Sequence, residues 1–415
     1  MMIPDVIEQH WEEAGMLWLR RCSAVSRPSF GLRSLSDLDE RLEAHLDGLR
    51  IAGKEGWELC LRTAAWEDAG EAFVLGVLAF AGETDARFNE VLKHVVTEPA
   101  LARGLVSALG WLDVSVTQFK IQELLKSKSP VERRIGLGAA AAHRLPLNGS
   151  LAEALKDDDE LLRARACRAV GEMGRGDLAR FVQPQIASAN EECAFWAAWS
   201  LAVLAPEAAV LNRLRDFVGA GSGRGERAAD VLFRRLNFAT AVDFQRQLAQ
   251  NPERARTAIM VAGIVGDPGL VPWLLEQMND PKKARLAADA FQTITGADFV
   301  MERLRNPTPP RPPVAEDAGE DQPPEPDTDL ECPNAEAIRQ WWKKNKERFN
   351  SGTRYLLGKP ITVEWLREVL VSGQQHQRAA AALELAARPA GQVLFNVAAP
   401  AFRQQAMLRK SDSKK

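Results

Sequence analysis

Residues 162–174 read LRARACRAVGEMG, and residues 254–266 read RARTAIMVAGIVG. The two glycines of the first stretch, Gly171 and Gly174, have counterparts in the second stretch, 92 residues later. Because 92 is about three times 31, we expect an internal repeat of about 31 residues. Ala and Gly at helical spacing would let neighbouring helices approach closely, so this stretch predicts tightly packed helix pairs.

Steps of one such period reach eight Ala-rich segments between about residues 60 and 298. The positions reached are Leu78, Leu109, Ala140, Gly171, Ala202, Phe233, Gly263 and Ile294. In residues 266–291 an apolar helix is followed by a turn and a second helix, and Pro281 suits the first turn of that second helix. Two short helices cannot bury their apolar faces alone. We therefore predict an all-α fold, an α-solenoid of stacked helix pairs.

These residues resemble HEAT repeats, in particular the short variety found in phycobilisome-lyase-like proteins, whose units read D-P-x-V-R-x-x-A-A-x-A-L-G-x-L-G-D. The match is good over residues 159–174 and 251–290 and weaker over residues 207–236. The resemblance implies a HEAT-like solenoid in which the second helix of each unit lines a concave surface.

Composition changes along the chain predict four segments. Residues 1–58 are expected to form an N-terminal helical cap, with Ser36 and Asp39 as the capping box of a helix that carries Leu38, Leu42, Leu46 and Leu49 on one face. Residues 59–305 are expected to form the repeats, and residues 335–415 the C-terminal helices with a last repeat and a basic tail. Residues 306–334, rich in proline and acidic residues, predict a disordered insertion. It is either solvated or an acidic tether that folds back on a basic face or mimics nucleic acid.

Charge and cysteine usage narrow the class of protein. The chain has 53 basic and 56 acidic residues, a net charge of −3, which provides little electrostatic affinity for nucleic acid. Its five cysteines form no CxxC, which argues against a disulfide framework or a zinc site. The amino-terminal residues lack a secretory signal, and no apolar run is long enough to cross a membrane. We expect a cytoplasmic protein without a membrane partner.

The sequence offers no catalytic constellation. The five histidines are scattered, and without a His-Glu dipeptide the chain lacks the iron ligands of the HEAT-like deoxyhypusine hydroxylases. The carboxylate run at residues 157–160 is interpreted as a helix cap that meets Arg163, in preference to a metal site. We therefore predict that the protein is not an enzyme and has no catalytic residue, metal, cofactor or small-molecule substrate.

A stripe of Arg and Trp residues is predicted to bind a partner protein. Steps of one repeat period from Arg165 and from Arg168 repeatedly reach these two residue types, which dominate interface hot spots. The predicted partner-binding residues are Arg134, Arg165, Arg168, Trp196, Trp199 and Arg227. The alternative is that both tryptophans pack against adjacent helices.

Residues 3–21, 38–58 and 349–362 (the last FNSGTRYLLGKPIT) resemble a family of proteobacterial HEAT-repeat proteins associated with type VI secretion gene clusters. The resemblance implies an immunity protein that binds a cognate toxin, such as a nuclease, and blocks its active site sterically. A secretion-cluster adaptor for effector loading is the alternative. A nucleic-acid-binding protein similar to the HEAT-like alkylpurine glycosylases is disfavoured by the charge balance.

Overall fold

The computed structural model describes residues 3–82, 84–147, 149–220, 223–306, 327–388 and 391–412. The described residues are nearly all helical, with one two-stranded sheet, so the predicted all-α class is confirmed. Most of the predicted insertion, residues 307–326, lies outside the described residues. None of the described helices is both long and apolar enough to cross a membrane.

The chain divides into two compact units, and the first is made of Met1–Arg213 and Val371–Lys415. Its helices are α1 (Pro4–Ala24), α2 (Leu32–Ile51), α3 (Gly53–Thr63), α4 (Ala69–Leu78), α5 (Thr84–Thr97), α6 (Ala102–Trp111), α7 (Val114–Leu125), α8 (Pro130–His143), α9 (Ser150–Ala154), α10 (Glu160–Glu172), α11 (Ala179–Val182), α12 (Glu191–Leu204), α21 (Gln375–Ala386) and α22 (Ala401–Asp412).

The second unit is Leu214–Leu370. Its elements are α14 (Gly225–Arg235), α15 (Phe238–Ala249), α16 (Ala255–Val265), α17 (Val271–Gln277), α18 (Pro281–Thr295), α19 (Ala335–Asn345), β1 (Tyr355–Leu356) and β2 (Lys359–Pro360). Two helices, α13 (Ala208–Ala220) and α20 (Val363–Ser372), cross the boundaries between the units. The units are defined by contacts and not by repeats, so the four-segment division stays a prediction.

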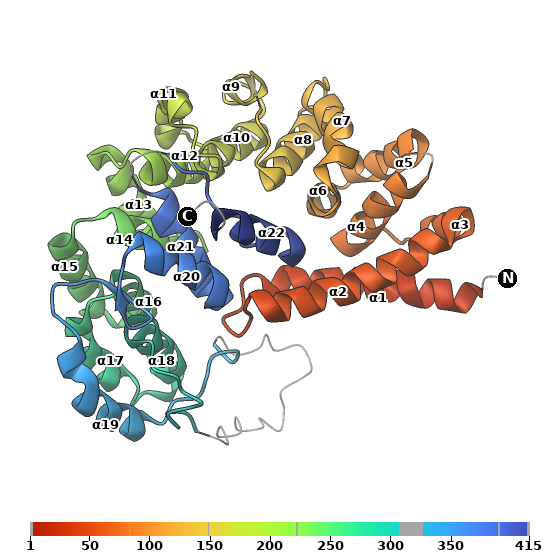
Figure 1. The fold of residues 1–415 in the computed structure, drawn as a ribbon. Coiled ribbons are helices and arrows are strands. Elements are labelled where there is room, and N and C mark those ends of the chain that lie inside the picture. The colour runs from red at the N-terminus through yellow and green to blue at the C-terminus, as the bar shows by residue number, and fades with distance from the viewer. Residues whose placement is uncertain are drawn as a thin grey trace, which may run out of the picture. The chain divides into compact units, whose positions relative to one another are not determined.

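All eight repeat positions lie within α-helices, namely α4, α6, α8, α10, α12, α14, α16 and α18. In the first unit these helices pack in chain order, α4 on α6, α6 on α8, α8 on α10 and α10 on α12 (Figure 1). In the second unit α14 packs on α16, and α16 on α18. Within a helix pair, the first helix packs against the second, as α7 does against α8.

Side-chain caps start three successive repeat helices at nearly equal spacing. Ser129, Asp159 and Asn190 stand at the N-caps of α8, α10 and α12, and each side chain accepts a hydrogen bond from a backbone amide of the first turn. Asp159 Oδ1 lies 2.7 Å from the amide nitrogen of Leu162. Arg163 donates to the carbonyl oxygen of Asp158 at 3.0 Å. The capping interpretation of the carboxylate run is therefore confirmed.

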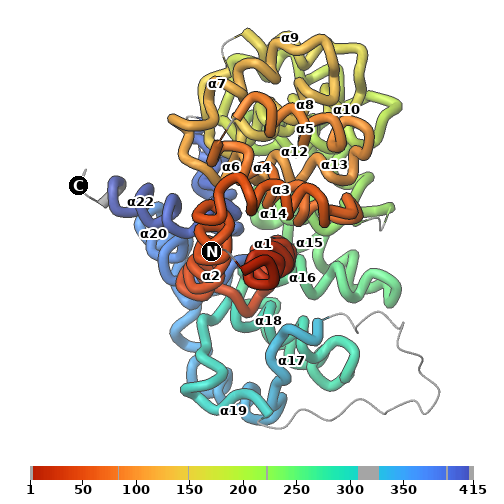
Figure 2. The backbone as a smooth tube through the Cα atoms, turned by 90° about the vertical axis from the view of Figure 1, so that its right-hand side faces the viewer, coloured from red at the N-terminus to blue at the C-terminus, as the bar shows by residue number. Residues whose placement is uncertain are grey.

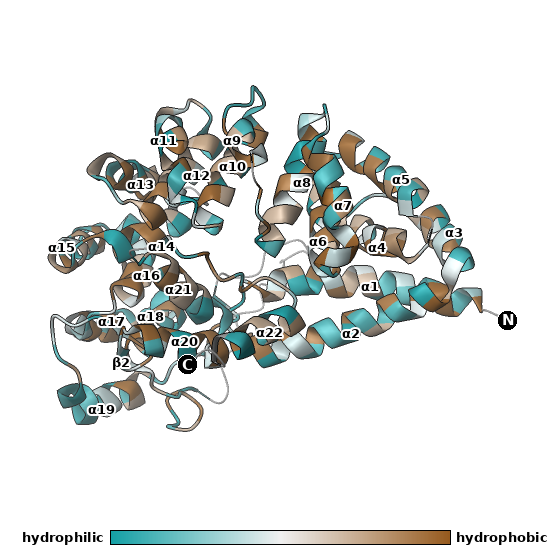
Figure 3. Cartoon of the chain, turned by 45° about the horizontal axis from the view of Figure 1, so that its top comes forward, coloured by the Kyte–Doolittle hydropathy of each residue, from teal (hydrophilic) through white to brown (hydrophobic). Residues whose placement is uncertain are grey.

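The predicted start of α2 is wrong. The four leucines predicted to share a face are buried, and the hydrophilic side of α2 is visible in Figure 3. However, the helix begins at Leu32, because Gly31 forms its N-cap and the Gly31 amide donates to Ser34 Oγ at 2.9 Å. Asp39 is thus an interior residue of α2, only 3% exposed, and it takes no part in the N-cap of that helix.

In the first unit a return segment, residues 391–404, crosses the carboxyl ends of the repeat helices in reverse order. At α10 the Leu394 amide donates to the carbonyl oxygen of Glu172 at 3.0 Å. At α8 Asn396 Nδ2 donates to the carbonyl oxygen of Ala142 at 3.2 Å. At α6 Arg403 Nη1 donates to the carbonyl oxygen of Gly110 at 2.7 Å. These donors satisfy carbonyls that a helix end leaves without an intrahelical partner.

The buried ion pair of Arg21 and Asp39 anchors this return segment. Arg21 Nε donates to Asp39 Oδ1 at 2.6 Å, and Arg21 Nη2 donates to the carbonyl oxygen of Ala399 at 2.9 Å. Asp39 Oδ2 accepts from the Ala401 amide at 2.6 Å. The amino-terminal hairpin of α1 and α2 therefore holds the start of α22, which packs on α2 (Figure 2).

In the second unit, residues 349–362 likewise cap the carboxyl ends of repeat helices. These residues are one of the motifs quoted above. The Tyr355 amide donates to the carbonyl oxygen of Gly266, just beyond α16, at 2.8 Å. The Leu357 amide donates to the carbonyl oxygen of Thr293 in the last turn of α18 at 2.6 Å. The motif's hairpin of β1 and β2 therefore caps two neighbouring repeat helices.

The repeated glycines have two different structural roles. Gly171 packs against the next helix, because a Cβ there would lie 2.9 Å from Ser200 Cα. Gly174 and Gly266 follow the ends of α10 and α16 with φ of +64° and +71°, a region that favours glycine. A Cβ at Gly174 or Gly266 would also overlap the carbonyl oxygen of Gly391 or Tyr355. Close packing and capping by the returning chain together explain the glycine pattern.

The two ends of the predicted insertion meet within the second unit. The Asn306 amide donates to the carbonyl oxygen of Cys332 at 2.9 Å, and the Asn334 amide donates to that of Leu304 at 2.8 Å. Near this junction Asp327 forms an ion pair with Arg256 of α16. An acidic residue at the base of the insertion therefore contacts a cation of its own unit.

We predict that Gly174→Ala lowers the free energy of unfolding by about 1–3 kcal/mol, because alanine is strained at this φ and its methyl group collides with the return segment. Gly176→Ala is the matched control. A Cβ at Gly176 meets nothing within 4 Å, so we expect a change within about 0.5 kcal/mol. Thermal and urea unfolding of both variants measure the difference. Equal stability of the two would contradict the capping role of the return segment.

Candidate functional site

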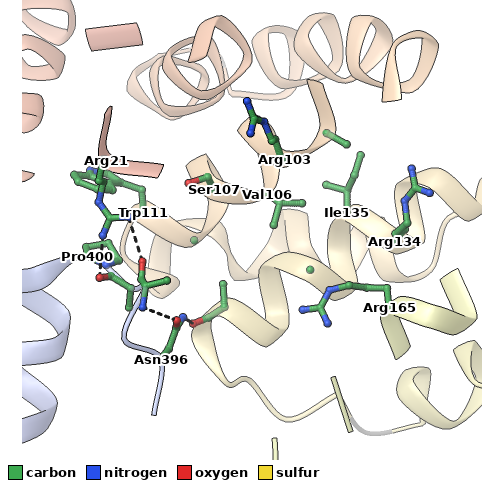
Figure 4. Close-up of a pocket in the computed structure, with 16 residues that line it drawn as sticks. Arg21, Arg103, Val106, Ser107, Trp111, Arg134, Ile135, Arg165, Asn396 and Pro400 are labelled. Carbon is green, nitrogen blue, oxygen red and sulfur yellow. Dashed lines mark hydrogen bonds between the residues drawn. The ribbon is translucent and has the colours of Figure 1, made fainter. Parts of the chain in front are cut away.

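The first unit contains a pocket of about 400 Å³ between α6, α8 and the return segment (Figure 4). Its cationic residues come from four helices, and its apolar residues come mainly from α6 and α8. The return segment forms one wall through Asn396 and Pro400. The lining cations are Arg21, Arg103, Arg134 and Arg165. No Asp or Glu is among the described residues that line the pocket.

Three of these arginines occupy one position of the repeat. Arg103, Arg134 and Arg165 follow one another at intervals of one period, on α6, α8 and α10. The sequence analysis identified Arg134 and Arg165 but missed Arg103, which one further backward step of the same length would have reached. Because successive repeat helices pack side by side, equal spacing along the chain places the three side chains around one pocket.

Glu172 is the anionic centre behind this row of arginines. It is 6% exposed, and it accepts from Arg165 Nη2 at 3.0 Å and from Arg168 Nε at 2.8 Å. Arg144 Nη1 lies 3.9 Å from the same carboxylate. Burial by itself would raise the pKa of Glu172, but the three arginines outweigh it and lower the pKa to about 2.

The arginines around the pocket and Glu172 outnumber the carboxylates that pair with them. Arg165 has a side chain only 18% exposed, and its buried Nη1 has no hydrogen-bond partner among the described residues. Burial lowers the pKa of Arg165, and the neighbouring Arg168 lowers it further, against the opposing effect of Glu172. Arg134 is half-buried, and the described residues provide it with no ion-pair partner. An anion in the pocket would supply the counter-charge that Arg134 lacks.

The other predicted partner-binding residues are placed in different surroundings. Arg168 Cζ lies 4.5 Å from the ring centroid of Trp196, and the rings of Trp196 and Trp199 are 5.6 Å apart. Trp196 is 8% exposed and donates to Glu192 at 2.6 Å, so it packs against its own unit. Trp199 is half-buried. Arg227 is exposed on α14 of the second unit. The partner-binding role of the set stays a prediction.

Sequence reasoning missed the pocket itself, because one wall comes from the distant return segment. Arg21 and the carbonyl oxygen of Ala398 are 377 residues apart in the chain and 3.1 Å apart in space. The sequence did contain a local signal of this segment. Residues 391–400 are uncharged and match neither the repeat nor a helix. The position of the segment on the helix ends could not be inferred from these residues.

Other reactive groups of the described residues form no recognisable reaction centre. No three His, Cys, Asp or Glu side chains in the described ranges are grouped so that they could hold a metal ion. Burial raises the pKa of the Cys60 and Cys167 thiols to about 12, so neither is an activated nucleophile near neutral pH. The pocket itself brings arginines together with apolar side chains.

We predict that Glu172→Gln lowers the free energy of unfolding at pH 7 by about 3 kcal/mol, because it leaves buried arginines without their counter-charge. The carboxyl pKa is about 2 in the folded chain, against an ordinary value of 4.5. Its contribution is therefore complete above about pH 5 and is lost as the pH falls towards 2. The difference between wild type and variant should shrink over that window.

Urea unfolding at several pH values between 3 and 7 measures this difference. The control is Glu58→Gln, which removes an exposed carboxylate 3.7 Å from Lys54. We expect it to change the free energy of unfolding by less than about 0.5 kcal/mol. A loss in Glu172→Gln that stays constant from pH 7 to pH 3 would show that the charge of Glu172 is not what stabilises the fold.

The chain was compared with protein-family models, with curated proteins and with solved structures. None of the three comparisons finds a match. The functional conclusion therefore depends on the repeat-spaced arginines and on the pocket that they line.

Proposed function

We propose that the protein is a HEAT-like solenoid that binds an acidic surface of a partner protein and has no catalytic role. The observation that carries this proposal is the row of Arg103, Arg134 and Arg165 at one position of successive repeats. Arginine is enriched at interface hot spots, because its planar guanidinium forms directional bonds to carboxylates over a large contact area.

The local charge supports an acidic partner. The pocket's lining arginines and the further arginines that share Glu172 amount to six guanidinium groups. Two carboxylates, Asp39 and Glu172, form ion pairs with them. The whole chain carries −3, so this excess of positive charge is local. Complementary charge on a partner would increase the association rate and orient the encounter.

We further propose that the partner is a cognate type VI secretion toxin and that the protein is its immunity protein in the cytoplasm. This step depends on the resemblance of residues 3–21, 38–58 and 349–362 to the secretion-associated family. Inhibition would be steric, through a large interface and slow dissociation. The arginine row suits an acidic toxin surface, whereas the acidic insertion would suit a basic nuclease cleft. An adaptor that loads effectors is the second candidate.

We predict that Arg134→Glu weakens partner binding at least tenfold, because it places a carboxylate where the acidic partner surface would dock. Arg134 lacks an ion-pair partner among the described residues, so its reversal breaks no described bond. The matched control is Arg62→Glu, an exposed arginine on α3 outside the pocket. Affinity capture from the source organism's cytoplasm in high salt, with mass spectrometry, compares wild type and both variants, and titration of the captured partner measures the affinity.

The captured species separates the candidates. One enzyme held in a one-to-one complex, inactive when bound and lost with Arg134→Glu, supports the immunity function. Secretion components captured without inhibition of any enzyme favour the adaptor. Nucleic acid that washes off with salt, or equal capture by Arg134→Glu and wild type, contradicts protein binding at the arginine row.

A further inference from the structure

The pocket combines a cationic edge with an apolar floor. Figure 4 shows Val106 of α6 and Ile135 of α8 between Arg103 and Arg134, with Arg165 approaching from α10. Arg165 lies beside a glycine, since a Cβ at Gly138 would be 3.7 Å from Arg165 Nε. The absence of a side chain at this glycine leaves room next to the guanidinium. A surface that only attracts charged partners does not require such an apolar floor.

Two polar groups of the pocket lack a full set of partners among the described residues. Arg165 Nη1 is buried and donates to no acceptor. Ser107 Oγ accepts from Trp18 Nε1 at 2.9 Å, which leaves its own hydrogen available, because a hydroxyl can donate and accept together. A buried donor without an acceptor destabilises the fold. The Ser107 hydroxyl can therefore donate to an oxygen of a ligand in the pocket, whereas Arg165 Nη1 has almost no accessible surface, so Arg165 contributes its charge and not this hydrogen bond.

We propose that this pocket is a binding site for a small amphipathic anion, a carboxylate or phosphate group carried on an apolar body. We place the head group at the arginine edge of the pocket, where Arg134 has no carboxylate partner among the described residues, and the apolar body over Val106 and Ile135. A volume of about 400 Å³ falls within the range that small-molecule sites occupy. Asn396 and Pro400 of the return segment form the wall that encloses the ligand.

This site shares Arg134 and Arg165 with the proposed protein interface, but its test needs no partner protein. The sequence analysis predicted no small-molecule substrate, and the pocket is proposed to bind its ligand without converting it. The Trp111 ring also lines the pocket, and its indole nitrogen donates to Glu43 at 2.6 Å. The indole N–H signal of Trp111, assigned with Trp111→Phe, therefore reports on binding at this place.

We test the proposal by titrating the full chain with phenylacetate and following the Trp111 indole signal by NMR. Phenylacetamide is the neutral analogue, phenyl phosphate carries the alternative head group, and inorganic phosphate lacks the apolar body. We expect phenylacetate or phenyl phosphate to bind at least tenfold more tightly than both phenylacetamide and inorganic phosphate. The tighter of the two organic anions identifies the head group.

The variants Arg134→Gln and Arg62→Gln provide the matched comparison. Arg134→Gln should weaken binding of the organic anion at least tenfold, and Arg62→Gln should leave it unchanged, with both variants keeping the thermal stability of wild type. Equal affinity for phenylacetate and phenylacetamide, or no effect of Arg134→Gln, would overturn the proposal. If the anion binds but no protein is captured from the cytoplasm, the pocket stands and the proposed partner function fails.

Discussion

The carboxyl ends of the packed repeat helices are the constraint on which the rest of the structure depends. Each helix ends with carbonyls that have no partner within the helix, and side-by-side packing gathers several such ends. The chain satisfies them by returning, with residues 391–404 in one unit and residues 349–362 in the other. Glycine is required at 174 and 266, because φ is positive there and because the backbone of the returning segment leaves no room for a Cβ.

The return segment also affects the arginines that line the pocket. The return segment closes one side of the pocket, so guanidinium groups that would otherwise face open solvent become partly buried. Glu172 compensates three of them and is itself held ionised by their charge. One carboxylate cannot neutralise three cations, and of these three arginines Arg165 lines the pocket. The same segment that completes the helix ends therefore also forms a wall of the pocket in which we propose that an anion binds.

A small part of the candidate site could be predicted from the sequence. Arg134 and Arg165 line one pocket as the repeat period implies, and Arg103 follows from the same arithmetic. The environment of each residue could not be predicted in this way. Trp196 and Arg165 occupy equivalent repeat positions, yet the tryptophan packs beneath Arg168 while the arginine reaches Glu172. Asp39 seemed suited to a helix cap, but tertiary contacts made it the buried partner of Arg21.

The sequence by itself determined the helices, their period and the arginine row, because hydrophobic spacing, capping residues and repeated glycines act over a few turns of one chain segment. Only the tertiary structure decided which helix ends the return segment caps, which cations keep a counter-charge and where a pocket remains. Those outcomes depend on groups that lie far apart in the chain, such as Arg21 and Ala398 with their separation of 377 residues. Contacts at that separation are set by the packing of the whole unit and leave no local pattern in the chain.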